Sequence, residues 1–294
     1  MRYRFLSLLL AASLGLSACA KTDPMDDVPA FEVDTATVTL EDQGDGEKRQ
    51  LVYSGGEQTT TVEVSYGVAQ GAVATDSVDP EAPAGGDVDK VTLPLTIYIA
   101  DDASEARVGE PKHSNLDAGT DSLTAEDFRM RWQHDVHGNI QDIKLLPPEG
   151  SSDEGRAIVE SALLQVLAAQ PVFPIEPVGE GATWTVQTRT IGGARMLRTT
   201  RYTVDSLDGD TVVLSLDIED EPTETELTID DTQAGGTLTA DEWSTTSDAT
   251  ITVDLTKPLP TQGQNAATTR TVYNGPNPDF KVVQDVTTAT TYGK

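Results

Sequence analysis

Apolar and polar residues alternate along several parts of the chain, with the period of a β-strand that buries one face. The alternation is clearest in residues 62–66, 91–99, 212–218 and 251–255. Glycine-containing turns are expected at Gly192-Gly193, Asp208-Gly209 and His137-Gly138-Asn139. Threonine is about one residue in eight, and β-branched residues favour strands. The pattern therefore predicts an antiparallel sheet with one covered face.

One helical pattern interrupts these strands. Ser151 and Glu154 have the spacing of a capping box, and Pro171 ends the pattern. Between them, apolar residues recur at helical spacing at Val159, Ala162, Leu163, Val166 and Leu167. We expect one main helix near residues 152–170. Two stretches, Gly67–Asp89 and Asp101–Asp121, hold few bulky apolar residues and are expected to be long loops.

The predicted fold class is α+β: a curved antiparallel β-sheet with one main covering helix, in a single β-rich domain over residues 31–294. A sheet with one apolar face must cover that face, and a single helix leaves a cleft beside it. The residues expected at this cleft are Leu93, Leu95, Ile97, Met130, Trp132, Leu163 and Trp184. They either line a cavity for an apolar ligand or form a plain packed core, and the pattern is the same in both cases.

The first residues predict export and lipidation. Arg2 and Arg4 precede an apolar run of about twelve residues, which is too short to span a bilayer. The run ends in Leu16-Ser17-Ala18-Cys19, which resembles the lipobox of bacterial lipoproteins. In that family the leader is removed and the cysteine carries a diacylglyceryl group. We therefore expect residues 1–18 to be a signal peptide, Cys19 to be the lipid attachment site and residues 19–30 to include a tether.

Two stretches near the centre carry a family resemblance. Residues 128–140 form a strand–turn–strand pattern. Residues 174–184 follow the helix, lead into a strand and contain the motif Pro-Val-Gly-x-Gly-x-x-Trp. They resemble an uncharacterised family of bacterial envelope lipoproteins, a domain of unknown function. More distantly they are similar to LolA-like and LppX/LprG-like lipoprotein carriers. The resemblance implies a half-barrel sheet wrapped over helices around an apolar cavity, and it supplies no catalytic residues.

Composition excludes several classes of function. The 294 residues include 49 Asp and Glu against 20 Lys and Arg, and the formal charge of −29 opposes nucleic-acid binding. Removal of residues 1–18 takes away two arginines and no acid, so the charge becomes −31. One cysteine excludes a disulfide framework within the chain. The acidic clusters at Asp217–Glu226 and Asp230-Asp231 lack the spacing of a calcium loop, so a solvated face is expected there.

Enzymatic chemistry is not expected. His134 and His137 lie three apart, but the segment reads as a strand entering a turn, so a zinc site is not predicted. No nucleophile elbow, phosphate loop or dinucleotide fingerprint is present, and no cofactor is predicted. The preferred interpretation is a non-enzymatic binding or carrier module for an apolar envelope molecule. It would be anchored to the cell membrane through Cys19 on the extracytoplasmic side. The alternative is a structural or protein-interaction lipoprotein with a packed core.

Overall fold

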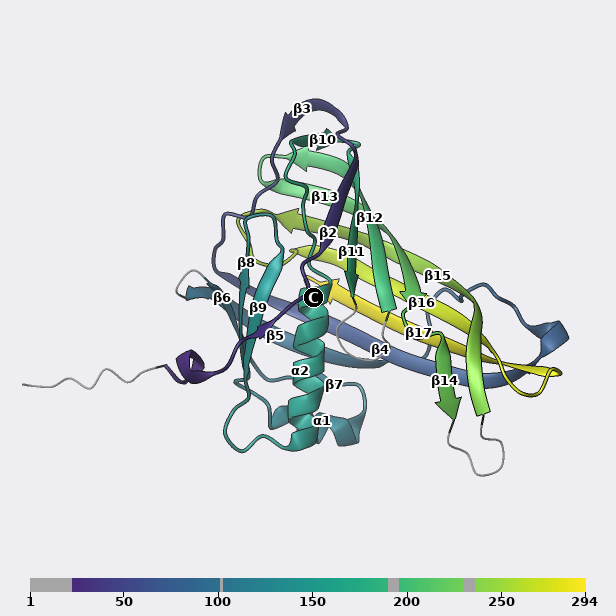
Figure 1. Cartoon of the computed structure of the whole chain (residues 1–294). Coiled ribbons are helices and arrows are strands. Elements are labelled where there is room, and N and C mark those ends of the chain that lie inside the picture. The colour runs from purple at the N-terminus through teal and green to yellow at the C-terminus, as the bar shows by residue number, and fades with distance from the viewer. Residues whose placement is uncertain (1–22, 101–102, 190–195, 230–235) are drawn as a thin grey trace, which may run out of the picture.

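The computed structural model describes residues 23–100, 103–189, 196–229 and 236–294 (Figure 1). Its helical elements are the 3-10 turns η1 (Pro24–Asp27) and η2 (Thr75–Ser77) and the α-helices α1 (Leu116–Leu123) and α2 (Asp153–Ala168). The strands before α2 are β1 (Phe31–Glu32), β2 (Thr37–Asp42), β3 (Asp45–Arg49), β4 (Gln58–Ala74), β5 (Asp89–Ala100), β6 (Ala103–Val108), β7 (Lys112–His113), β8 (Arg129–His134) and β9 (Ile140–Leu146). Those after it are β10 (Val178–Glu180), β11 (Thr183–Arg189), β12 (Met196–Asp208), β13 (Thr211–Pro222), β14 (Glu226–Ile229), β15 (Gly236–Asp254), β16 (Gln262–Asn274) and β17 (Phe280–Tyr292).

The fold is dominated by one large, curved, antiparallel sheet that does not close on itself, as Figure 1 shows. Its strands follow the order β1-β9-β8-β6-β5-β4-β17-β16-β15-β13-β12-β11-β2, with β14 beside β15 and β7 beside β5. β3 and β10 form a separate pair. The expected α+β class with a curved antiparallel sheet is therefore confirmed.

Helix α2 lies against the concave face and buries its apolar side there (Figure 1). Leu163 and Val166 are fully buried in the same core as the apolar residues of the strands. The amide of Gln165 donates to the backbone oxygens of Ser65 (3.1 Å) and Ala289 (3.0 Å), which ties the helix to β4 and β17. The helix begins one residue later than expected, because Ser152 and not Ser151 accepts the capping bond from the Gly155 N–H.

The two edges of the sheet are joined by four residues. β1 pairs with β9 at one edge, and β2 pairs with β11 at the other. Residues 33–36, which we call the crossing segment, connect β1 to β2. Five Cα–Cα steps from Glu32 to Thr37 reach about 17 Å at full extension. The crossing segment therefore closes the open side of the sheet near the C-terminal end of α2 (Figure 1).

The prediction of a loop over Gly67–Asp89 is wrong for much of this stretch. β4 continues to Ala74 and pairs with β17 throughout, so the small residues of this stretch lie in a strand. Only residues 78–88 connect to β5 without regular structure, and they pack on the outer face. The Ala82 N–H donates to Ser244 (2.8 Å) and its carbonyl accepts from Thr246 (2.8 Å).

The second expected loop, Asp101–Asp121, is also wrong. Residues 103–108 form β6 between β5 and β8, and residues 116–123 form α1. The alternation of β6 was hidden because Glu105 is a charged residue at a fully buried position. Arginines of the neighbouring strand neutralise it, and a sequence pattern cannot register that pairing. The expected turns at Gly138 and Gly209 are confirmed, whereas Gly192-Gly193 lies outside the described residues.

If α2 is clamped against the sheet, truncation of its core face will be costly. We expect Leu163→Ala to lower the free energy of unfolding by about 2–5 kcal/mol, because the side chain is fully buried. Chemical denaturation followed by circular dichroism measures this loss. Ser161→Ala, on the exposed face of the same helix, is the matched control and should change stability by less than about 0.5 kcal/mol. Equal effects of the two variants would mean that α2 lies loosely on the surface.

Candidate functional site

The residues expected to line an apolar cleft are brought together, but inside a packed core. All seven are at most 1% exposed and belong to one continuous cluster: Leu93, Leu95, Ile97, Met130, Trp132, Leu163 and Trp184. Aromatic rings fill the region beside the helix end. Trp184 stacks on Tyr202 with ring centroids 5.3 Å apart, and its indole N–H donates to the Val172 carbonyl (2.9 Å). Side chains, rather than empty space, occupy this part of the sheet.

A small cavity lies under the crossing segment, at the C-terminal end of α2. Its volume is about 60 Å³, and its walls are mostly apolar. The lining residues are Val33, Asp34, Ala36, Gly138, Ile140, Leu167, Ala168, Gln170, Val172, Thr188 and Arg189. Gln170 is buried, and its side-chain oxygen has no hydrogen-bond partner. This cavity can hold a few water molecules, whereas ligand pockets usually measure 300–1,000 Å³.

Beyond the helix, the concave face is filled by polar side chains. The guanidinium of Arg198 on β12 binds both carboxylate oxygens of Asp220 on β13 at 2.7 Å. Asp220 also accepts from Thr269 (3.1 Å) on β16. We call the group the polar seam; its members are Arg198, Asp220, Thr245, Thr269 and Thr288. The side chain of Asp220 is only 6% exposed, so the ion pair lies in the interior.

The polar seam also shows how strongly the sheet is curled. Arg198 on β12 donates to the Thr288 hydroxyl on β17 at 3.3 Å. Three strands separate β12 from β17 in the sheet, so a flat sheet would place them about 19 Å apart. Burial opposes the charged form of Arg198, but the hydrogen bonds and charge of Asp220 outweigh it and hold its pKa above the ordinary value. Arg198 therefore keeps its positive charge at every physiological pH.

Beside and beyond the polar seam, the long strands carry exposed apolar side chains. Four large apolar residues of β4, β15 and β17 are 41–50% exposed: Tyr66, Val68, Trp243 and Phe280. We call them the distal apolar patch. Side chains alternate between the two faces of a strand, so Tyr66 and Val68 lie on the same inward face of β4 as Val62 and Val64. None of these four residues is among the seven cleft residues, and none of them lines the small cavity.

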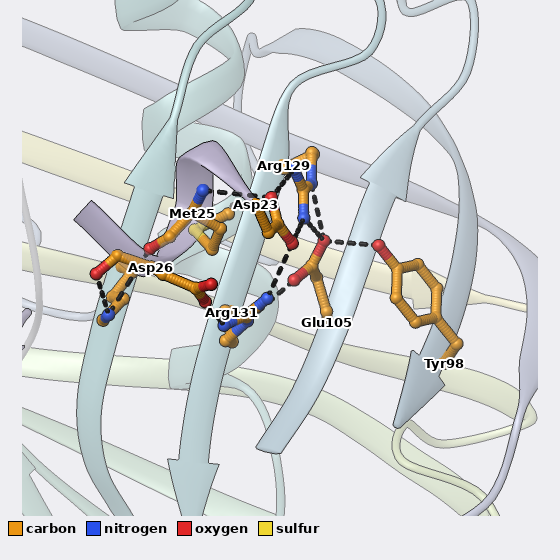
Figure 2. A network of polar contacts seen from close by, with 8 residues as sticks. Asp23, Met25, Asp26, Tyr98, Glu105, Arg129 and Arg131 are labelled. Carbon is orange, nitrogen blue, oxygen red and sulfur yellow. Dashed lines mark hydrogen bonds and ion pairs between the residues drawn. The ribbon is translucent and has the colours of Figure 1, made fainter. Parts of the chain in front are cut away.

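A second polar network fixes the N-terminal segment to the outer face, as Figure 2 shows. Arg129 donates through both terminal nitrogens to the Asp23 carboxylate, at 2.7 and 2.6 Å. Arg131 reaches Asp23 and Asp26 at 3.1 Å. Both arginines also bind Glu105, at 2.6 and 2.7 Å, and the Tyr98 hydroxyl donates to the same carboxylate. We call the docking of Asp23–Asp27 on this cluster the N-terminal clamp.

Apolar burial adds to the N-terminal clamp. Met25 is fully buried, and its carbonyl accepts from Lys144 (3.4 Å) on β9. The hydrogen bonds and charge of Arg129 outweigh partial burial and hold the pKa of Asp23 well below its usual value. A depressed carboxyl pKa adds stability that is present at neutral pH and is lost only as pH falls below the ordinary range for Asp. Residues 23–27, part of the tether expected over residues 19–30, are thus docked on the sheet.

The remaining sequence candidates do not assemble into a metal centre within the described residues. There is no group of three or more His, Cys, Asp or Glu placed to hold an ion in that part of the chain. His134 ends β8 and His137 lies within the β8–β9 turn; the Nδ1 atom of His134 lies 2.8 Å from the Asp135 carbonyl oxygen. In the acidic stretch of β13, Asp217, Glu219 and Glu221 are exposed while Asp220 points inward. Cys19 and Asp230-Asp231 lie outside the described residues.

Comparison of the sequence with protein-family models and with curated proteins gives no significant match. Within residues 23–100, 103–189, 196–229 and 236–294, no helix is long and apolar enough to cross a membrane. The fold and the side-chain geometry therefore carry the functional argument.

Sequence reasoning missed the polar seam, although a signal was present. On β13, Asp220 lies on the same inward face as the apolar residues Val212, Leu214, Leu216 and Ile218. On β12, Arg198 lies on the same inward face as Tyr202 and Val204. A carboxylate and a guanidinium at core-facing positions of two paired strands indicate a buried ion pair. The N-terminal clamp had no such signal, because Asp23 and Arg129 are separated by 106 residues.

The polar seam predicts a large, rescuable loss of stability. Asp220→Ala strands the Arg198 charge in the interior and should lower the free energy of unfolding by about 3–5 kcal/mol. Arg198→Met combined with Asp220→Leu should recover most of it, because both charges are removed. Arg107→Ala, which breaks an exposed pair with Asp127, is the control and should cost at most about 1 kcal/mol. Urea denaturation measures all three, and a small loss in Asp220→Ala would show that water reaches the seam.

Proposed function

We propose that the protein is a non-enzymatic, lipid-anchored module of the extracytoplasmic membrane surface, which acts through its surface and not through a lipid-filled interior. The observation that carries this proposal is the burial of all seven cleft residues in one continuous core. The leader ending in Leu16-Ser17-Ala18-Cys19 supports the anchor. A diacylglyceryl group has two acyl chains, which suffice for stable membrane attachment.

The packed core favours a protein-interaction module over a carrier. A carrier needs an apolar cavity of several hundred Å³ for an acyl chain. The cavity beside the helix end measures about 60 Å³, and the ion pair of Arg198 and Asp220 occupies the next part of the concave face. An acyl chain entering there would have to displace a paired charge, which is costly in an apolar environment. The distal apolar patch is instead exposed and available to a partner.

A carrier function remains as a second candidate because of one observation. The small cavity is mostly apolar and lies beneath the crossing segment, whose Asp34 forms an exposed pair with Arg189 at 3.8 Å. Exposed pairs contribute little, so this contact alone does not hold the segment shut. Movement of residues 33–36 would join the cavity to the core beneath α2 and give an acyl chain a way in.

The anchor is tested by altering the lipidation site. We expect Cys19→Ala to remain unprocessed or to become soluble, because diacylglyceryl transfer needs the thiol. Detergent phase separation of cell fractions, with the mass of the mature protein, measures both outcomes. Ser17→Ala, which keeps a small residue before the cysteine, is the matched control and should still be processed. A Cys19→Ala product that is cut before residue 19 and still partitions with membranes would contradict the lipoprotein assignment.

The interior is tested by its lipid content. We expect organic extraction of the purified mature protein to yield no stoichiometric lipid besides the covalent anchor. We also expect no saturable micromolar binding of a fluorescent fatty acid to the soluble form that starts at Ala20. Saturable binding would favour the carrier, and Ala36→Trp should then abolish it by filling the cavity mouth. Ala30→Trp, on an exposed position outside the cavity, is its control.

A further inference from the structure

The N-terminal clamp holds the chain a few residues from the proposed anchor. Asp23 is four residues after Cys19, and four extended steps reach about 14 Å. Arg129 and Arg131 bind Asp23 through three hydrogen bonds, and Met25 is fully buried against the sheet. The folded domain is much longer than this reach, because the 19 residues of β15 alone extend about 63 Å.

From this arrangement we infer that the outer face of β6, β8 and β9 is the membrane-facing surface of the protein, and that the N-terminal clamp sets this orientation. The inference rests on the proposed lipid anchor at Cys19. A free tether would let the domain tumble, whereas a docked turn leaves only about 14 Å of chain between the lipid and this face. The bilayer surface is thus the partner of the outer face.

The opposite end of the molecule then points away from the membrane. Figure 1 shows η1 at one side and the tips of β14, β15 and β16 at the other. Of the distal apolar patch, Trp243 belongs to β15, and Phe280 begins β17, which pairs with β16. The orientation therefore presents the exposed aromatic residues to the extracytoplasmic space, where a protein partner can reach them.

The charge of the outer face agrees with a position near anionic headgroups. β6, β8, β9 and the docked turn carry four basic and five acidic side chains, whereas the chain has 20 basic and 49 acidic residues. These side chains are Arg107, Arg129, Arg131 and Lys144 against Asp23, Asp26, Asp27, Glu105 and Asp142. This face is therefore repelled less by a negatively charged membrane than a surface with the average charge of the whole chain would be.

Energy transfer to the bilayer tests the orientation. The lipidated full-length mature protein is placed in phosphatidylethanolamine and phosphatidylglycerol vesicles that carry an acceptor dye on the headgroups. A donor dye is attached at Gln133→Cys, on the outer face of β8, or at Glu242→Cys, on β15; both positions are exposed. Because lipid occupies the thiol of Cys19, each added cysteine is the only free thiol. We expect clearly higher transfer from position 133 than from position 242.

Release of the N-terminal clamp should reduce that difference. Asp23→Ala with Asp26→Ala removes the carboxylates that bind Arg129 and Arg131, and we expect the transfer difference to fall by at least half. Met25→Ser should give the same result by removing the buried side chain. Asp27→Ala, an exposed residue of the same turn, is the matched control and should leave the difference unchanged.

Flotation of the vesicles separates the two claims. If all variants float with the vesicles and positions 133 and 242 give equal transfer, the orientation is overturned while the anchor stands. An unequal transfer that persists in both the double variant and Met25→Ser would also overturn the role of the N-terminal clamp. If no form of the protein floats, the anchor itself is wrong, and the orientation falls with it.

Discussion

An open sheet must keep water away from its apolar face, and in this chain one short helix does so. The 16 residues of α2 extend about 24 Å, whereas the 17 residues of β4 extend about 56 Å. Figure 1 shows that α2 crosses β4 and does not run along it, so the helix covers only part of the length of the long strands. Leu163 and Val166 complete a dry core over that part. The polar seam and the distal apolar patch lie on the part of the concave face that α2 does not cover.

Polar side chains take over where the helix ends. Threonine suits this position, because its methyl group packs on the sheet while its hydroxyl finds partners across strands. Thr245 and Thr269 lie 3.1 Å apart on β15 and β16, beside the Arg198–Asp220 pair. The abundance of threonine thus reflects a sheet whose two faces are both partly polar. Aromatic residues make up only 5% of the chain, and several of them pack together in the core, as Phe173 and Trp184 do with ring centroids 6.1 Å apart.

Local patterns in the sequence predicted the elements that bury a regular apolar face. The helix near residues 152–170 and the strands at 91–99 and 212–218 follow from their periodicity. β6 did not follow, because Glu105 is buried among arginines that lie more than twenty residues away. The packed state of the cleft residues could not be predicted either, since a filled core and a cavity have the same alternation. Their difference depends on how far the sheet curls, which the contact between Arg198 and Thr288 shows.

The N-terminal segment connects the outer face, the two sheet edges and the cavity. Residues 23–27 are docked by Arg129 and Arg131, after which β1 pairs with β9 and β2 pairs with β11. Because the chain between these contacts is short, the crossing segment cannot swing far while both ends are held. The ion pairs of the outer face therefore restrict opening of the small cavity under residues 33–36 as well. Docking of the N-terminal turn and closure of the core depend on the same twenty residues, 23–42.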